Sequence, residues 1–570
     1  MESWVLSSLH KIYPDAAPAG DYTRLTGLRN EALSFQIAFR HDGDPLPAYT
    51  RIDAALPVSA YRVDYLPLLE GKNAGSDGGE ECTGAGLYPD VLRPRLPQPP
   101  MEAEGPLWFE QGERHLLTAV RCWQSLWLTI NEEGAALPAG EYPVTVRFYA
   151  RSGQTLLAEQ TVTVTLLPAL LPPQKLWYTN WFHADCMADS HRVALFGEEF
   201  FRILHSYAHV AAVHGMNTFL LPAFTPPLDT PVGGERATAQ LVGVRVDTAQ
   251  GERQYSFDFS LMERYIRVCL EAGITRFEHS HFFTQWGAQY APKVVGTQDG
   301  AEKRLFGWDT PAAEGEYPRF LRQYIPALRA FLRTLGLEQR VLFHISDEPP
   351  ADSLADYAAA RAVVEPLLRG CTVGDALSDY AYYQQGLTQT PIVSTTAIES
   401  FLGRCEDLWC YYTGASLQNG LSNRVISLPS VRNRVLGMQM YRYGIRGFLE
   451  WGYNYTYSRL SHGFDNPASF PGLYDMTNGG AFIVYPDHRG GAAFPSIRLK
   501  VFAEGVQDMR ALEALEALTG REAVCAQLDR LFGGQLTFHS CPASADALLA
   551  VRQAVNCAIA AACEKKGVSS

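Results

Sequence analysis

The sequence has 570 residues, 48 basic and 61 acidic side chains, a net charge of -13 and a hydrophobic fraction of 47%. A chain of this length can form large packed cores, and its charged fraction of 19% excludes a disordered or coiled-coil protein. The acidic balance disfavours nucleic acid and anionic membranes as partners, so we expect a neutral ligand.

The amino-terminal stretch MESWVLSSLHKIYPD lacks the basic lead and the long apolar core of a secretory signal. No apolar run approaches the ~20 residues that cross a bilayer, which predicts a protein without membrane association. The 11 cysteines are odd in number and scattered, with no CxxC pair, as in a reduced cytoplasmic protein. No GxSxG elbow, Walker loop or GxGxxG stretch is present, so no cofactor is predicted.

Up to about residue 170 the sequence alternates apolar and polar positions, and turn residues recur about every ten positions. Tyr142, Val144, Val146 and Phe148, for example, occupy alternate positions, which is typical of half-buried antiparallel strands. We therefore predict an antiparallel β-sandwich over residues 1–172. It ends at the proline-rich stretch LLPALLPPQK.

Eight apolar segments follow, most of them separated by stretches with helical periodicity. They are residues 176–182, 216–221, 274–283, 340–346, 371–377, 391–396, 407–412 and 446–454. This order indicates an α/β protein with a (β/α)8 TIM barrel, predicted over residues 173–520, although the connections after the fifth and sixth segments are short for full helices. Such a barrel carries its chemistry at the carboxyl ends of the strands. Residues 521–570 are predicted to form a short helical extension.

The fourth segment ends in HISDEPP, which places Asp347 and Glu348 at the predicted mouth of the barrel. Two neighbouring carboxyls suit glycoside hydrolysis, because one must keep a proton for the leaving oxygen while the other stays ionised. The plainer alternative is that the two acids precede a helix that begins near Pro349 and Pro350, since acids favour that end of a helix.

Aromatic residues gather at the ends of the same segments, where they could stack on the flat CH-rich faces of a sugar while nearby polar groups bind its hydroxyls. For any single aromatic residue, packing in the core is the better interpretation. The residues expected to bind the sugar are Asn180, His183, His281, Trp286, Trp409, Tyr411, Tyr412, Glu450, Trp451 and Asn454.

A metal site is the alternative use of the histidines. His279 and His281 share a face of the third segment and, with His183 and an acid such as Asp375 or Asp379, would resemble a hydrolase metal site. Hydrogen-bonding or structural roles are the stronger expectation for these histidines, so no metal is predicted.

The stretches HISDEPP, RGFLEWGYN and FPSIRLKVFAEGVQDMRALEAL together resemble the DUF4091 (domain of unknown function) proteins related to glycoside hydrolase family 123. The earlier stretches RNEALSFQIAF, YPDVL and PAGEYPVTV look like the β-sandwich that those proteins carry ahead of the barrel. The resemblance covers most of the chain.

The resemblance implies a retaining glycosidase in which the substrate's own 2-acetamido oxygen attacks the anomeric carbon. Carried onto this chain, it makes Glu348 the general acid and then base, while Asp347 orients the acetamido N–H. It also implies a tyrosine hydroxyl near the acetamido carbonyl and an aromatic floor, for which Tyr411 or Tyr412 and Trp451 match best. The expected activity is removal of a terminal β-linked N-acetylhexosamine, with N-acetylgalactosamine as the favoured sugar.

Three alternatives stay open: a glycan-binding protein without catalysis, a glycosidase for a different sugar, and a metal-dependent barrel hydrolase. The expected partner is a carbohydrate substrate. The oligomeric state is not specified by the sequence, and a homodimer is left open.

Overall fold

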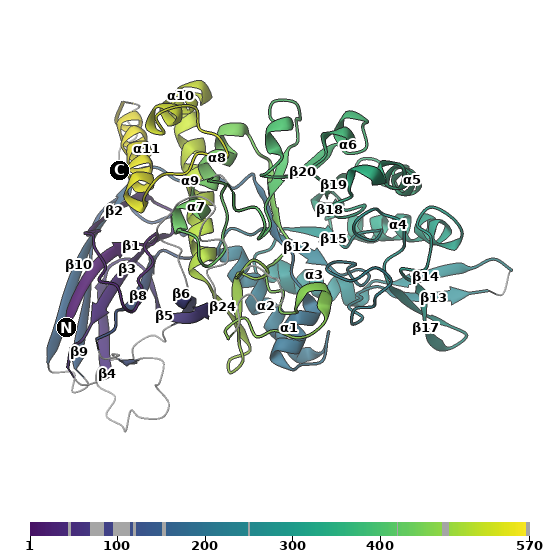
Figure 1. Cartoon of the computed structure of the whole chain (residues 1–570), viewed down its shortest axis with the longest axis horizontal. Coiled ribbons are helices and arrows are strands. Elements are labelled where there is room, and N and C mark those ends of the chain that lie inside the picture. Colours follow the sequence, from purple (N-terminus) through teal and green to yellow (C-terminus); the bar gives the residue numbers. More distant parts are fainter. Residues whose placement is uncertain are drawn as a thin grey trace.

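The computed structural model describes residues 1–43, 47–68, 85–94, 115–117, 121–150, 155–248, 251–418, 420–469 and 478–565. In Figure 1 the strand-rich amino-terminal part lies on one side and the barrel on the other, with the carboxyl-terminal helices above the former. The ten described cysteines form no disulfide, and Cys82 lies outside the described residues.

Two five-stranded sheets form the amino-terminal part. The first has the order β1(Glu2–Ser7), β3(Leu33–Arg40), β8(Gln124–Ile130), β5(Val58–Leu68), β6(Gly86–Pro94). The second has the order β2(Arg24–Leu28), β10(Leu156–Leu167), β9(Gly140–Ala150), β4(Pro47–Ala54), β7(His115–Leu117). Alternate residues of both sheets, such as Phe35 and Val146, form one buried core. The sheets are antiparallel as predicted except at β2, which runs parallel to β10.

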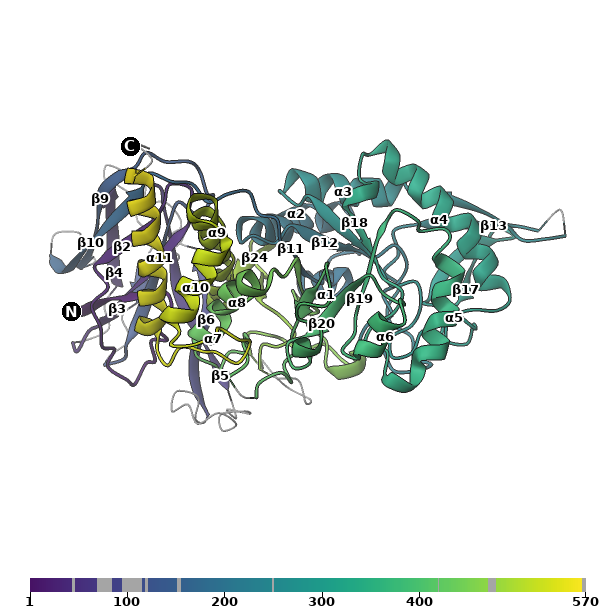
Figure 2. The same cartoon turned by 90° about the horizontal axis from the view of Figure 1, so that it is seen from above.

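The second part contains a closed barrel of eight parallel strands, one for each of the eight predicted segments, and the sixth strand begins one residue before its segment. The strands are β11(Trp177–Asn180), β12(Thr218–Leu221), β15(Arg276–His279), β18(Val341–Phe343), β19(Thr372–Ala376), β20(Thr390–Ser394), β21(Trp409–Tyr411) and β22(Gly447–Glu450). The barrel closes where β11 pairs with β22, and Figure 2 shows it from above.

Helices follow most of the strands. They are α1(Ala184–His191), α2(Glu198–Val213), α3(Ser260–Glu271), α4(Glu316–Thr334), α5(Leu354–Val364), α6(Tyr380–Gln384), α7(Ser430–Arg434) and α8(Leu436–Tyr443). The connections after β19 and β20 are short, as predicted: α6 has 5 residues, and a 3-10 turn at Ile398–Ser400 replaces the next helix.

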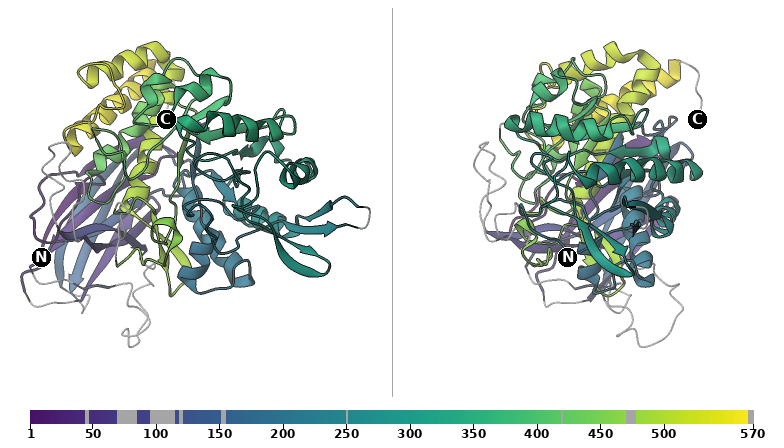
Figure 3. Two further views of the ribbon diagram at one scale, coloured as in Figure 1. Left: turned by 45° about the vertical axis from the view of Figure 1, so that its right-hand side comes forward. Right: turned by 90° about the vertical axis from the view of Figure 1, so that its right-hand side faces the viewer.

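Two small sheets were not predicted. A four-stranded sheet, which includes strands that project from the barrel in Figure 3, consists of β13(Gly243–Asp247), β14(Gln254–Asp258), β16(Val294–Gln298) and β17(Ala301–Phe306). A two-stranded sheet, β23(Val484–Asp487) and β24(Ala492–Pro495), lies in the Gly/Pro-rich excursion after β22. Both arise from segments that follow a barrel strand and to which no strand was assigned from the sequence.

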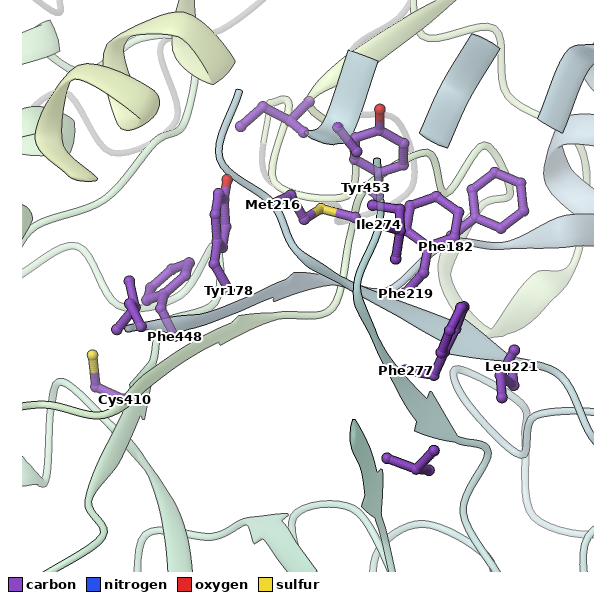
Figure 4. Close-up of a cluster of buried hydrophobic side chains, with 14 of the residues drawn as sticks. Tyr178, Phe182, Met216, Phe219, Leu221, Ile274, Phe277, Cys410, Phe448 and Tyr453 are labelled. Atoms are coloured by element: carbon purple, nitrogen blue, oxygen red, sulfur yellow. The ribbon is translucent and has the colours of Figure 1, made fainter. Parts of the chain in front are cut away.

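The long helix α9(Ile497–Thr519) packs between the barrel and the sandwich. Its Phe502 ring lies 4.8 Å from Tyr178 and 4.7 Å from Phe448 on the outer face of the barrel. Figure 4 shows these two barrel residues within the buried cluster. On its other side, Gln507 of α9 exchanges hydrogen bonds with the backbone of Ala32 in the sandwich.

Two more helices, α10(Arg521–Leu531) and α11(Ala545–Lys565), end the chain. Arg552 of α11 is buried and forms ion pairs with Glu31 of the sandwich and Asp508 of α9. Asp508 also pairs with Arg434 of α7. This charge cluster joins the sandwich, the barrel helices and the chain end.

By length and composition alone α11 could cross a membrane, which corrects the expectation that no apolar run is long enough. An 18-residue window within its 21 residues has a mean hydropathy of 1.3, but a packed core helix passes the same test. The helix is partly buried against the protein, with 39% of the apolar window inside, and its buried Arg552 is paired there. This is weak evidence for a membrane segment.

Candidate active site

A pocket of about 370 Å³ opens where the barrel strands end, and both Asp347 and Glu348 line it. Single-ligand pockets in proteins begin at about 300 Å³, so its size suits one sugar ring with its substituents. Three of the aromatic residues predicted from the sequence, Trp286, Tyr411 and Trp451, are also part of the lining. The remaining lining residues are Trp181, Leu228, Asp229, Gln285, Ala376, Thr413, Gly414, Ala415, Leu449, Arg459, Gly480 and Ala481.

The chain bends sharply at the carboxyl pair, which lets two consecutive side chains reach one pocket. Strand β18 ends at Phe343, and Glu348 adopts a φ of +42°, in the left-handed region that a non-glycine residue rarely occupies. The Glu348 N–H donates to the Ala376 carbonyl at 3.0 Å, and the Trp286 N–H donates to the Asp347 carbonyl at 2.8 Å. Such strain persists only where neighbouring bonds hold it, and it concentrates at functional sites.

The two carboxyls have different surroundings. Burial and the nearby Glu348 carboxylate raise the pKa of Asp347 well above its usual value. Glu348 is exposed to the pocket, and its Oε1 accepts a hydrogen bond from the Tyr411 hydroxyl at 2.5 Å. This hydrogen bond orients the Glu348 carboxyl in the pocket. The surroundings of Asp347 favour its protonated form.

A buried cluster of charged residues, His344, Glu278 and Asp375, lies beneath the carboxyl pair. His344 is fully buried, its Nε2 lies 3.1 Å from Glu278 and its Nδ1 lies 3.5 Å from Asp375. Burial lowers the pKa of His344, but the hydrogen bonds and charges of the two acids outweigh burial and raise it to about 9. Asp375 also accepts hydrogen bonds from the backbone N–H groups of Ile345 and Ser346. The group thus fixes the segment that leads into Asp347.

His281, His344 and Asp375 are the described residues that come close enough to suggest a metal site. Both ring nitrogens of His281 lack a hydrogen-bond partner among the described residues. However, the rings of His281 and His344 stack at 4.6 Å with an interplanar angle of 22°, so their in-plane lone pairs do not converge on one point. Asp375 already binds the Tyr357 hydroxyl and two backbone N–H groups. This donor set therefore fits a metal ion poorly.

The structure does not bring together the histidines of the metal alternative. His279 is hydrogen-bonded to the Tyr324 hydroxyl at 2.8 Å on the outer side of the barrel. His183 contacts the Trp451 carbonyl at 2.9 Å and Arg236 at 3.2 Å, and burial followed by the charge of Arg236 lowers its pKa to about 4. Neither residue is in the group that contains His281.

Seven of the ten residues expected to bind the sugar do not line the pocket. Tyr411 faces the barrel interior, and the next residue, Tyr412, points to the outer face, where its ring lies 5.1 Å from Phe448. Trp409 is the first residue of β21, so it lies at the other end of the barrel from Tyr411, next to Trp177. The seven residues are Asn180, His183, His281, Trp409, Tyr412, Glu450 and Asn454.

Four of these residues support the strand ends instead. Buried Arg424 binds both Asn180 and Glu450, which lie side by side where β11 pairs with β22. The Asn454 side chain accepts a hydrogen bond from the His183 N–H and donates one to the His183 carbonyl, at 2.8 and 3.0 Å. These contacts hold the segment that carries Trp451.

Sequence reasoning missed one wall of the pocket. Asp229 follows β12, and its N–H donates to the Gln285 side chain at 2.9 Å. The Asp229 carboxylate accepts hydrogen bonds from the Leu460 N–H and the Tyr455 hydroxyl. Arg459 lies beside Leu460 and lines the same pocket. The sequence offered one signal for this wall: Gln285 directly precedes Trp286, which was predicted to bind the sugar, and Gln285 itself was not considered.

A closed parallel barrel with two adjacent carboxyls in a sugar-sized pocket at its strand ends is typical of a glycoside hydrolase. The family described as glycoside hydrolase 123, catalytic domain, matches residues 181–515, which is more than half of the chain. The protein therefore belongs to glycoside hydrolase family 123 and is a glycosidase.

The fold is similar to that of a family 123 glycoside hydrolase from Clostridium perfringens that is described for glycolipid glycan hydrolysis. The TM-score is 0.71 at 12% identity, over 100% of both chains. A β-glucuronidase from Bacteroides uniformis covers 80% of this chain and 47% of its own, with a TM-score of 0.30 and 10% identity. One from Ruminococcus gnavus covers 84% and 67%, with a TM-score of 0.25 and 8% identity. No curated protein matches the sequence.

Proposed function

We propose that the protein removes a terminal β-linked N-acetylhexosamine, with N-acetylgalactosamine as the first candidate, and that it retains configuration by substrate-assisted catalysis. The observation that carries the proposal is the placement of Asp347 and Glu348 in one pocket of about 370 Å³. A third acid of the pocket, Asp229, is already bound by Leu460 and Tyr455. It is therefore poorly placed as a nucleophile, and the sugar's own acetamido oxygen takes that role.

The proposed steps follow from the positions of the two carboxyls. Glu348 protonates the glycosidic oxygen while the acetamido oxygen attacks the anomeric carbon and the glycosidic bond breaks. Asp347 accepts a hydrogen bond from the acetamido N–H and so orients the group for attack. Glu348, now ionised, then removes a proton from the water that opens the oxazolinium-like intermediate.

Substrate binding also changes the charge of Asp347 in this scheme. In the free protein, burial and the nearby Glu348 carboxylate favour protonated Asp347. The acetamido N–H donates to Asp347 and therefore favours its ionised form. Trp286 and Trp451, both in the lining, supply apolar surface for the ring faces.

The test is hydrolysis of chromogenic α- and β-glycosides by the purified protein. We expect turnover of 4-nitrophenyl N-acetyl-β-galactosaminide and a loss of at least about 100-fold in kcat for Glu348→Gln and Asp347→Asn. Glu522→Gln, an exposed site on α10, is the matched control. Azide should rescue Glu348→Ala on an activated substrate. Silence on every 2-acetamido sugar, or unchanged turnover in Glu348→Gln, would refute the proposal.

Sugar binding measured by calorimetry without any hydrolysis would instead identify a glycan-binding protein. Membership of the DUF4091 group and a cytoplasmic location stay predictions of the sequence.

A further inference from the structure

The pocket contains one cationic side chain among its described lining residues, Arg459. The same lining holds three carboxylates, those of Asp229, Asp347 and Glu348. Arg459 is exposed, and its guanidinium forms no ion pair or hydrogen bond with the described part of the chain. Most of the arginines near acids in this protein are paired, as Arg236 is with Asp185. An unpaired guanidinium in an acidic pocket is therefore available to bind a ligand.

The turn that carries Arg459 is held firmly in place. Leu460 and Ser461 both adopt a φ of +57°, which costs free energy in residues other than glycine. The Leu460 N–H donates to the Asp229 carboxylate at 2.8 Å, and the Ser461 hydroxyl donates to the Asp229 carbonyl at 2.9 Å. Asp229 is in turn fixed by Gln285, which precedes Trp286. The strained turn thus keeps the base of the Arg459 side chain on the wall that carries Trp286.

We infer that Arg459 binds an oxyanion on the substrate, so that the enzyme prefers glycosides that carry a sulfate ester or a carboxylate next to the cleaved bond. This inference rests on the proposed function and names its substrate class. A guanidinium presents paired N–H donors that match the oxygens of both groups. A protein with a net charge of -13 and three carboxylates in its pocket would otherwise repel such a substrate.

Two substrate pairs distinguish the sources of the oxyanion. The first pair is 4-nitrophenyl N-acetyl-β-galactosaminide with and without a 6-O-sulfate. The second pair is a disaccharide in which the leaving sugar is glucuronic acid or glucose. For each pair, the readout is the ratio of kcat/KM for the anionic substrate to kcat/KM for the neutral one, in wild type, Arg459→Gln and Arg459→Lys. Arg530→Gln removes the same charge from an exposed position on α10 and is the control.

We expect the wild-type ratio to exceed one for at least one pair and to fall by about 10-fold in Arg459→Gln. Arg530→Gln should keep the wild-type ratio. The ratio should also shrink as salt is raised, because the contact lies at an exposed site. A preference in the first pair identifies a sulfated sugar, and one in the second pair identifies a uronic acid leaving group.

The inference is wrong if Arg459→Gln keeps the wild-type ratio for both pairs while neutral N-acetylhexosaminides are hydrolysed. That result leaves the proposed function intact. If no glycoside is hydrolysed, the proposed function fails, and calorimetry with N-acetylgalactosamine and its 6-sulfate still tests the inference. Equal affinity for the two sugars would then overturn it, and tighter binding of the sulfated sugar that is lost in Arg459→Gln would support it.

Discussion

The hydrogen bond from Tyr411 to Glu348 allows a quantitative test of the acid role. The donor hydroxyl is almost completely buried, at 6% exposure for Tyr411, and lies 2.5 Å from Oε1 of Glu348. Hydrogen bonds to charged groups contribute about 1.5–3 kcal/mol. Tyr411→Phe removes this contribution to holding the Glu348 carboxyl in position for proton transfer.

The size of the effect follows from the free energy. At 1.36 kcal/mol for each factor of ten in rate, a loss of about 1.5–3 kcal/mol corresponds to a fall of about 10- to 150-fold. Because Glu348 must be positioned to protonate the leaving oxygen, we expect kcat of Tyr411→Phe to fall by this amount. The assay is hydrolysis of an N-acetyl-β-galactosaminide with a poor leaving group, for which leaving-group protonation limits the rate.

Tyr412→Phe is the matched control, since the Tyr412 hydroxyl is buried and has no hydrogen-bond partner among the described residues. It should leave kcat unchanged. A 2,4-dinitrophenyl leaving group needs little protonation, so the difference between wild type and Tyr411→Phe should nearly vanish with it. If kcat of Tyr411→Phe falls equally on both substrates, Tyr411 acts on the substrate rather than through Glu348, and the reasoning is refuted.

Three further predictions concern stability. Because the pKa of Asp347 is raised in the folded protein, the wild type should lose stability as the pH rises above the usual aspartate range. Asp347→Asn should remove this loss, so that its Tm exceeds that of the wild type at pH 8 but not at pH 4. His344→Gln leaves two buried carboxylates without their cation and should cost about 3–5 kcal/mol in urea unfolding at pH 6. Because the pKa of His344 is raised to about 9, the stabilisation by the His344 charge is complete below pH 6.5 and declines toward pH 9. If wild type and His344→Gln differ in unfolding free energy by the same amount at pH 10 as at pH 6, this prediction is wrong. A Cβ on Gly437 would lie 1.8 Å from a carbonyl oxygen of α9, so Gly437→Ala should destabilise the protein by about 3 kcal/mol. Gly463→Ala is the control and should not destabilise the protein, because a Cβ on Gly463 has no atom within 4 Å.

The sequence predicted the barrel well because each of its strands is a short apolar run with a turn signal on either side. The parallel strands are covered on both faces, so their apolar character is continuous and easy to identify. The inserted sheet of β13, β14, β16 and β17 gave a weaker signal. Strands such as Gly243–Asp247 are half exposed, and their alternation is too short to predict a strand from the sequence.

The site was predictable only where it is local. Asp347 and Glu348 are neighbours in sequence, so their common pocket required just one bend of the chain. Arg459 enters the pocket because Leu460 binds Asp229, which lies 231 positions earlier, and no sequence pattern specifies that contact. Tyr412 and Trp409 show the opposite error. Both were assigned to the pocket because they lie near the end of the seventh apolar segment. Alternation turns Tyr412 outward, and strand direction places Trp409 at the far end of the barrel.

The charge cluster that joins Glu31, Asp508 and Arg552 has a consequence for how the protein is made. Glu31 and Arg552 are 521 positions apart, so the ribosome completes most of the chain before this ion pair can form. Until then the sandwich carries a carboxylate without its partner at a surface that later becomes buried. Contacts of such long sequence separation also slow folding. Helix α11 therefore completes the sandwich only long after the sandwich itself has been synthesised, and nascent chains that have not reached α11 should be the ones that chaperones and proteases recognise.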